Sequence, residues 1–257
     1  MHSIADSELF LPDIETHAAC EVHERLRQQG LVFFQFRIDR QAFVQWFNRL
    51  FLIQHHPDSS SDGITEVAAT GHEPKHGASS GFTNQALPLH VDGSAERVPP
   101  SILCLLLVAS AHGGGQTMLS DALDLFHWCV AQPDMQGVLA FSSRAKFREA
   151  EYPIFDPLID PRSLTFRFRQ DQYLWPAAGV SVADLRRLAI QLESKALNVT
   201  LVPGEGYLLH NHRWTHGRGQ FVGPRLAWRL LGSIRSEDSH ADLNDGFLIP
   251  HLGGEKQ

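Results

Sequence analysis

The pattern of hydrophobic and polar residues predicts a few amphipathic helices separated by many short strands. Apolar residues recur at helical spacing in three stretches, and each stretch follows a residue type that often caps a helix. The predicted helices run to Gln29 with Asp13 or Thr16 as the cap, from Asp39 through Phe51, and over residues 182–196 with Ser181 as the cap. Gly30 follows the first helix, where glycine typically ends a helix. Another helix is predicted to start near Ser120 within residues 119–131.

Strands are predicted where apolar residues run together or alternate with polar ones. These segments are residues 31–36, 101–109, parts of 143–178, 207–212 and 225–231. In the last segment Arg225, Ala227, Arg229 and Leu231 face one way, whereas Leu226, Trp228 and Leu230 face the other. Residues 57–81 are polar and glycine-rich without a clear period, so a long loop is predicted there.

Many short strands with long insertions and peripheral helices indicate a mainly β fold with flanking helices (α+β). The core is predicted to be a double-stranded β-helix (jelly roll). No internal repeat divides the chain, so residues 1–257 are expected to form one domain. Its parts would be N-terminal helices and a strand at 10–56, an active-site loop at 57–85, and the jelly-roll core at 86–235.

The amino-acid composition restricts the kinds of partner that the protein is expected to bind. The formal charge of −7 and the isoelectric point near 6.1 disfavour nucleic acid, because phosphate binding needs a basic surface. The scattered residues Cys20, Cys104 and Cys129 suit neither a disulfide framework nor a cysteine zinc site. The first residues lack a signal peptide, and the longest apolar run, 102–111, is too short for a bilayer. We expect a cytoplasmic protein with a small-molecule substrate and no membrane partner; no pattern indicates an oligomeric state.

A candidate metal site begins with His90 and Asp92. Residues at i and i+2 of an extended segment point to the same side, so both side chains can reach one ion. A distant histidine would complete a two-histidine, one-carboxylate site of the kind that holds Fe(II) and leaves positions open for O2. His216 is the best-placed third ligand, with His210 and His212 as alternatives. The i, i+4 spacing of His212 and His216 would suit zinc on a helix, but the glycines around them favour an extended segment.

Two arginines on one face of an otherwise apolar strand are costly to bury unless an anion meets them. Arg225 and Arg229 are in this position, and a dicarboxylate bound next to the iron would be a suitable anion.

Four segments together carry a resemblance to a known family. They are residues 89–92, the Gly-Gly-x-Thr segment 114–121, residues 211–218 and residues 225–229. In them the chain resembles the Fe(II)/2-oxoglutarate-dependent oxygenases of the taurine dioxygenase and clavaminate synthase-like group. The resemblance implies that His90, Asp92 and His216 are iron ligands and catalytic residues. It also implies that Thr117 and Arg229 hold the distal carboxylate of 2-oxoglutarate, with Arg225 as the second candidate.

By this resemblance the protein would be an Fe(II)- and 2-oxoglutarate-dependent dioxygenase. It would hydroxylate an unactivated carbon of a small molecule, such as an amino acid or its derivative, and use O2 to release succinate and CO2. Desaturation or cyclisation could begin from the same hydrogen abstraction. An inactive metal-binding or sensor relative, and a zinc hydrolase that uses His210, His212 or His216, remain alternatives.

Substrate contacts are expected from polar residues near the predicted site. The candidates are Asn84, Gln85, Arg167, Asp171 and Arg218, with Arg169 in the same segment as Asp171. They carry both charge signs, which would suit an amino acid, although an exposed arginine in a loop is an equally good reading of Arg218.

Overall fold

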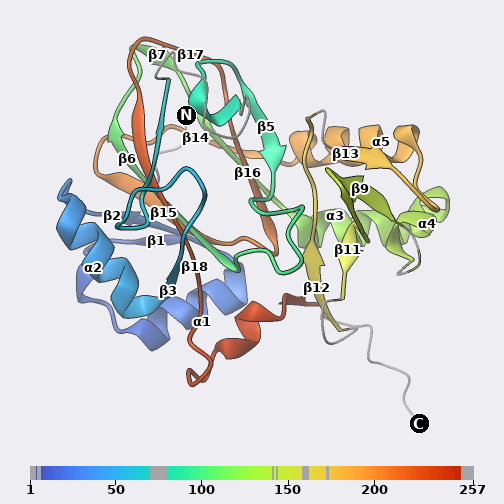
Figure 1. The fold of residues 1–257 in the computed structure, drawn as a ribbon, viewed down its shortest axis with the longest axis horizontal. Coiled ribbons are helices and arrows are strands. Elements are labelled where there is room, and N and C mark those ends of the chain that lie inside the picture. The colour runs from blue at the N-terminus through green and yellow to red at the C-terminus, as the bar shows by residue number, and fades with distance from the viewer. Residues whose placement is uncertain are drawn as a thin grey trace.

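The computed structural model describes residues 4, 7–69, 80–140, 142, 144–157, 162–171 and 174–249. It is mostly β with helices on the outside (Figure 1). The larger, 7-stranded sheet has the order β1-β2-β15-β6-β18-β3, and β4 also pairs with β18. The bounds of its strands are β1 Phe10–Leu11, β2 Leu31–Gln35, β3 Leu52–Gln54, β4 Thr65–Ala68, β6 Ile102–Ala109, β15 Glu205–His210 and β18 Leu226–Ser233.

A second, 4-stranded sheet has the order β14-β8-β16-β5. Its strands are β5 Leu87–His90, β8 Thr117–Asp121, β14 Leu197–Val199 and β16 Trp214–Arg218. Three small sheets complete the fold, with orders β10-β9-β13, β11-β12-β19 and β17-β7. Their strands are β7 Gly113–Gly114, β9 Ala145–Phe147, β10 Ala150–Tyr152, β11 Phe155–Asp156, β12 Ser163–Phe166, β13 Leu174–Pro176, β17 Phe221–Val222 and β19 Phe247–Leu248.

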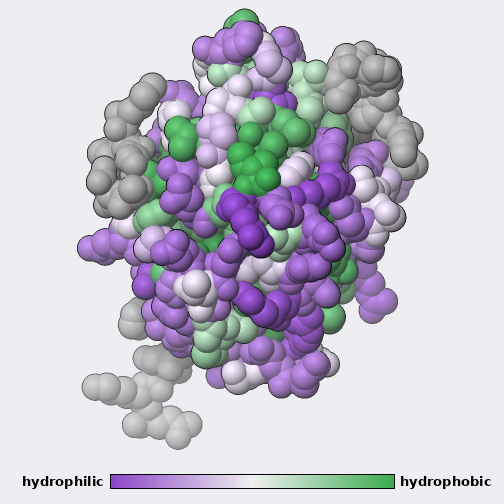
Figure 2. Space-filling model, turned by 90° about the vertical axis from the view of Figure 1, so that its left-hand side faces the viewer, coloured by the Kyte–Doolittle hydropathy of each residue, from purple (hydrophilic) through white to green (hydrophobic). Residues whose placement is uncertain are grey.

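The larger sheet is buried on both faces. On one face, Leu105 of β6 and Ala227 of β18 pack with Leu119 of β8, a strand of the smaller sheet. On the other face, Trp228 and Leu230 pack against two amphipathic helices, α1 (Ala19–Gln29) and α2 (Arg40–Leu50). The alternation predicted for residues 225–231 is therefore confirmed from Ala227 onward. Figure 2 shows that the side of the molecule with α2 is mostly hydrophilic, as expected for helices that bury only one face.

The outer face of the smaller sheet is covered by α3 (Ala122–Ala131) and α5 (Val182–Ser194). A short helix, α4 (Gln136–Leu139), and 3-10 turns at Ile14–Thr16, Ser80–Phe82, Pro133–Met135 and Ala241–Asn244 lie between the larger elements. No helix in the described part of the chain combines the length and the apolar character needed to cross a membrane.

Most predicted helix ends are confirmed. The Asp39 side chain accepts a hydrogen bond from Ala42 N at 3.0 Å. Ser181 forms a reciprocal capping box with Asp184. Gly30 ends α1 with a φ of 70°, the left-handed conformation that glycine adopts without strain.

Two local predictions were wrong, those of the start of the first helix and of the loop at residues 57–81. The first helix begins at Ala19, because Asp13 has a φ of 52° and caps only a 3-10 turn without a side-chain hydrogen bond. The helix expected to start near Ser120 is confirmed, with Asp121 as its cap and Ala122 as its first residue. The stretch 57–81 contains strand β4, which pairs with β18; residues 70–79 of that stretch lie outside the described residues.

Candidate active site

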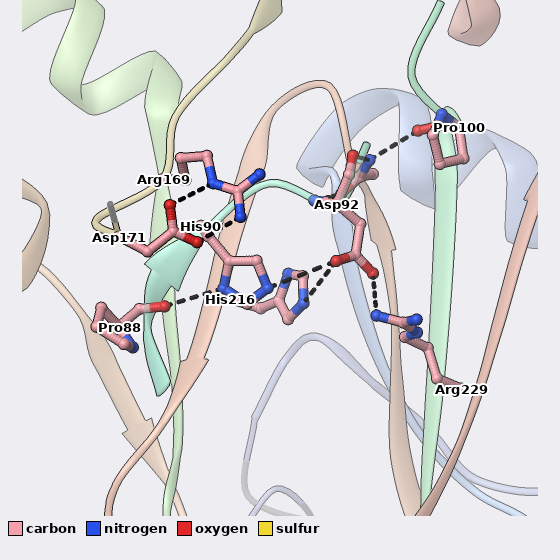
Figure 3. A network of polar contacts seen from close by, with 9 residues as sticks. Pro88, His90, Asp92, Pro100, Arg169, Asp171, His216 and Arg229 are labelled. Carbon is pink, nitrogen blue, oxygen red and sulfur yellow. Dashed lines mark hydrogen bonds and ion pairs between the residues drawn. The ribbon is translucent and has the colours of Figure 1, made fainter. Parts of the chain in front are cut away.

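Two neighbouring strands and the turn after one of them bring the three candidate ligands together. β5 and β16 are antiparallel, and His216 stands opposite His90 in their register. Asp92 follows β5 by two residues, and its Oδ1 lies 3.5 Å from His90 Nε2 and 4.0 Å from His216 Nε2. The potential ligand atoms of these residues all lie within 4.8 Å of one another. Figure 3 shows both imidazole rings turned toward the same carboxylate.

Backbone contacts hold these side chains in place. His90 Nδ1 lies 2.9 Å from Pro88 O, and because a carbonyl can only accept, this nitrogen carries the proton and leaves Nε2 free to bind a metal. The buried side chain of Asn211 donates to Asp92 O at 2.9 Å and to Pro100 O at 2.8 Å, and accepts from Asp92 N at 3.2 Å. The turn that carries the carboxylate is therefore tied to Asn211, the residue that follows β15.

The charge state of the cluster suits a divalent metal ion. Burial opposes ionisation of Asp92, but Arg229, His90 and His216 outweigh it and hold its pKa well below the usual range. Burial, assisted by His90, lowers the pKa of His216 to about 3, so this ring stays neutral near pH 7. Two imidazoles and one carboxylate on one side of an ion are the donors of a non-haem Fe(II) site. The residues present therefore fit Fe(II).

Arg229 lies at the metal side of the site. Its Nη1 donates to Asp92 Oδ2 at 2.8 Å, so the two carboxylate oxygens are divided between the arginine and the two histidines. Its buried Nε has no hydrogen-bond partner among the described residues. The sequence led us to expect Arg229 beside Thr117 at the distal end of 2-oxoglutarate. The structure instead joins Arg229 to a candidate iron ligand.

Arg225 occupies a different environment. It is 7% exposed, and no hydrogen bond or ion pair joins it to another residue in the described part of the chain. Its Nε lies 3.5 Å from the point where a Cβ on Gly115 would stand, close to the start of β8 and buried Thr117. Burial lowers the pKa of Arg225, and nearby Tyr207 partly offsets this; burial in turn raises the pKa of Tyr207 well above its usual range. Among the described residues no acid neutralises this buried guanidinium, as expected of an anion-binding group.

The alternative histidines point elsewhere. His210 Nε2 lies 2.8 Å from Leu243 O, and His212 Nε2 lies 3.0 Å from Pro99 O. Burial lowers the pKa of both rings, to about 4 for His212. The backbone contacts occupy these histidines in the fold, so of the three candidates only His216 lies with His90 and Asp92.

Arg167 is not a substrate residue. It is fully buried, and its donors go to Asp156 Oδ2 at 2.8 Å and to the carbonyl oxygens of residues 94, 96 and 97 at 2.6–3.0 Å. Its guanidinium also stacks 4.0 Å from the centre of the Tyr152 ring. The expectation that Arg167 contacts substrate was wrong, because the turn after Asp92 uses its hydrogen-bonding capacity.

The other candidates divide into two groups. Arg218 is buried and donates to Thr83 O and Gln85 O at 3.0 Å, so it fixes the loop that enters β5. In that loop, exposed Asn84 and Gln85 are joined by a side-chain hydrogen bond of 3.2 Å. Arg169 donates through Nε to Asp171 at 2.6 Å, and this pair lies on the His90 side of the site (Figure 3).

Two residues near the site were missed by the sequence analysis. His56 is close enough to Arg229 and Asp92 for both to influence its pKa, which burial lowers. It lies at the start of a polar stretch without periodicity, so no sequence signal marked it. Tyr207 was assigned to a strand, but its proximity to Arg225 depends on the pairing of β15 with β6, which the sequence does not specify.

The fold and site together define a class, the non-haem iron dioxygenases that bind their metal through two histidines and one carboxylate. The chain belongs to the family of taurine catabolism dioxygenases described as TauD/TfdA, whose model matches residues 3–131, half of the chain. It is therefore an Fe(II)- and 2-oxoglutarate-dependent dioxygenase that uses O2. The matched region includes His90, Asp92 and Thr117; for His216, Arg225 and Arg229 the support is geometric.

Solved structures share the fold at low sequence identity. PvcB from Pseudomonas aeruginosa has a TM-score of 0.65 and 16% identity, with 89% of this chain and 88% of that chain covered. A taurine dioxygenase from Burkholderia xenovorans has a TM-score of 0.64 and 15% identity, with 90% of this chain and 94% of that chain covered. An asparagine oxygenase in complex with Fe(II), 3-hydroxyasparagine and succinate has a TM-score of 0.65 and 13% identity, with 82% of this chain and 78% of that chain covered. No curated protein sequence matches the chain.

Proposed function

We propose that the protein hydroxylates an unactivated carbon of a small amino acid or amino-acid derivative, with His90, Asp92 and His216 as its iron ligands. The observation that carries this proposal is the convergence of three metal-binding groups from β5, its following turn and β16. Fe(II) with 2-oxoglutarate supplies, when bound, the oxidation of such a carbon by O2, with release of succinate and CO2. The protein residues hold, orient and desolvate the reactants.

The two arginines have different roles in this proposal. Arg229 positions Asp92 by holding Oδ2, which directs Oδ1 toward the histidines. Arg225 and Thr117 bind the distal carboxylate of 2-oxoglutarate, as suggested by the buried guanidinium near β8, which meets no acid among the described residues. Arg225 directly precedes β18 and Arg229 lies within it, so up to about 13 Å of extended chain separates their Cα atoms. A dicarboxylate bound at the iron by one end needs its second anion site at a distance, so Arg225 suits that site better than Arg229.

The substrate lies on the His90 side of the site. Phe168 O accepts a hydrogen bond from Val91 N at 2.9 Å, which places the following residues next to the metal-binding turn. The Arg169 and Asp171 side chains there are 18% and 40% exposed and carry opposite charges. A zwitterionic amino acid is complementary to such a pair. The asparagine oxygenase of similar fold supports this substrate class.

The overall architecture in this proposal is one oxygenase domain over residues 1–257 whose two larger sheets form a jelly roll. Within the segment 57–85, the parts outside β4 serve as the active-site loop. The positions around it support this role, because His56 precedes it close to Asp92 and Arg218 fixes its last residues through Thr83 O and Gln85 O.

The test has a binding step and a turnover step. Anaerobic addition of 2-oxoglutarate to the Fe(II) protein should produce a weak visible charge-transfer band, and its absence would refute the cofactor assignment. Succinate formation should then be measured with a panel of amino acids. A substrate that accelerates succinate formation and gains one oxygen atom supports hydroxylation; loss of two hydrogens without added oxygen would indicate desaturation. A band without any substrate-dependent turnover would favour the inactive relative.

Substrate contact can be tested separately. Arg169→Ala should raise KM for the amino acid while leaving the affinity for 2-oxoglutarate unchanged. Arg187→Ala is a matched control, because Arg187 also pairs with an aspartate, Asp134, but on α5. An unchanged KM in Arg169→Ala would exclude the pair from substrate binding.

A further inference from the structure

A second group of potential metal ligands lies apart from the active site. It comprises His23 on α1 together with Asp238 and His240 in the segment after β18, and the potential ligand atoms lie within 4.8 Å of one another. Figure 1 shows this C-terminal segment running beside α1, at the edge of the molecule. The cluster shares no residue with the iron site. His23 is 1% exposed, whereas the side chains of His240 and Asp238 are 14% and 28% exposed, so one ligand is rigidly buried and the others are reachable.

The protonation of His23 leaves one nitrogen without a role in the fold. Its Nε2 lies 3.1 Å from Leu50 O, and because a carbonyl only accepts, Nε2 carries the ring proton. Nδ1 then presents a lone pair, and this buried atom has no hydrogen-bond partner in the described part of the chain. It lies 3.3 Å from Asp238 Oδ2, so two acceptors face each other unless a cation lies between them.

We propose that this cluster is a binding site for a divalent transition-metal ion of the zinc class, with His23, Asp238 and His240 as its protein ligands. Zinc–nitrogen and zinc–oxygen bonds of about 2.0–2.1 Å put neighbouring tetrahedral ligand atoms about 3.3 Å apart. The observed separation of His23 Nδ1 and Asp238 Oδ2 is 3.3 Å. His240 Nδ1 lies 3.1 Å from the other oxygen of the same carboxylate. A water molecule would be the fourth ligand.

The second ring nitrogens of His23 and His240 have neighbours of the kind found around metal-binding histidines. A ligating histidine usually gives its second ring N–H to a carbonyl or carboxylate, which fixes the ring and makes the first nitrogen more basic. Leu50 O does this for His23. Glu24 Oε2, 3.4 Å from His240 Nε2, lies in the matching position for His240. The ion would join α1 and the end of α2 to the segment after β18, so its role is to fix the C-terminal part of the chain.

The number of Zn(II) ions bound by the full-length protein at neutral pH tests this site, measured by equilibrium dialysis with elemental analysis. Zn(II) also suits the iron ligands, so the wild type should bind two equivalents. The double variant His90→Ala/His216→Ala should retain one, and adding His240→Gln should remove it. His17→Gln is the matched control, because His17 also contacts a carboxylate, Glu21 at 2.8 Å, just before the same helix.

Asp238→Asn in the double-variant background gives a second measurement in which both imidazole rings of the cluster are kept. It should lower Zn(II) affinity at least tenfold while circular dichroism shows an unchanged fold. Zn(II) should also raise Tm in the double variant and not after His240→Gln is added. The proposal would be overturned if the double variant His90→Ala/His216→Ala bound no Zn(II). It would also be overturned if that variant retained its Zn(II) after addition of His240→Gln and of Asp238→Asn. A metal-free His23 ring protonated on both nitrogens by NMR would also overturn it, because a proton would then occupy the place of the ion.

Discussion

Replacing Arg225 by Gln tests the distal carboxylate site. The side chain is 7% exposed, so solvent screens its charge weakly, and no acid in the described part of the chain would be left unpaired by its removal. The cost should therefore appear in ligand binding and only slightly in folding. Loss of one partner of a buried charge pair costs about 2–5 kcal/mol. At about 1.4 kcal/mol per factor of ten, the affinity for 2-oxoglutarate should fall about 30- to 4,000-fold.

The assay is anaerobic titration of the Fe(II) protein with 2-oxoglutarate, followed by the visible charge-transfer band. A parallel titration uses 2-oxopentanoate, which has the same metal-binding end but lacks the distal carboxylate. The wild type should prefer 2-oxoglutarate strongly, and Arg225→Gln should bind both ligands almost equally. Arg229→Gln should keep the preference while weakening Fe(II) binding, because it releases Asp92 Oδ2. If Arg225→Gln keeps the preference and Arg229→Gln abolishes it, our assignment of the two arginines is refuted.

Other residues of the site and its support should respond in distinct ways. His216→Ala should lower Fe(II) affinity sharply with an unchanged circular dichroism spectrum, and full iron binding would contradict its role as a ligand. Asn211→Ala should destabilise the protein by about 2–4 kcal/mol in urea unfolding, because three backbone groups lose their partner. Arg167→Met should cost about 3–5 kcal/mol by the same assay, since Asp156 is left as an unpaired, poorly exposed carboxylate, while 2-oxoglutarate affinity stays intact. Burial lowers the pKa of His212 from 6.5 to about 4, so the unfolded chain binds a proton that the folded protein excludes. Stability should therefore fall as the pH drops from about 6.5 to 4, and His212→Gln should reduce that slope; an unchanged slope would show that His212 does not contribute.

Local signals predicted those parts of the fold that local interactions determine. Helices after Asp39 and Ser181 were predictable because a side chain in the sequence satisfies the first free N–H groups. Strand β4 could not be recognised from local signals. Its partner β18 is far away in the sequence, and the strand places polar Thr65 and Glu66 in the sheet. The start of α1 was missed because Ala18, which gives no side-chain cap, precedes it.

The same distinction explains what could be predicted about the site. The two-residue period of an extended segment is a local property, so it correctly placed His90 and Asp92 on one side. Strand alternation predicted Arg225 and Arg229 on one face, but the register shifts between Leu226 and Ala227, and alternation alone cannot tell which partner each arginine meets. That depends on the neighbouring strands: β5 brings Asp92 to Arg229, whereas β7 and the following Gly115 lie beside Arg225. Two arginines that look equivalent in the sequence therefore have different environments, because Arg229 contacts Asp92 whereas Arg225 lies beside Gly115.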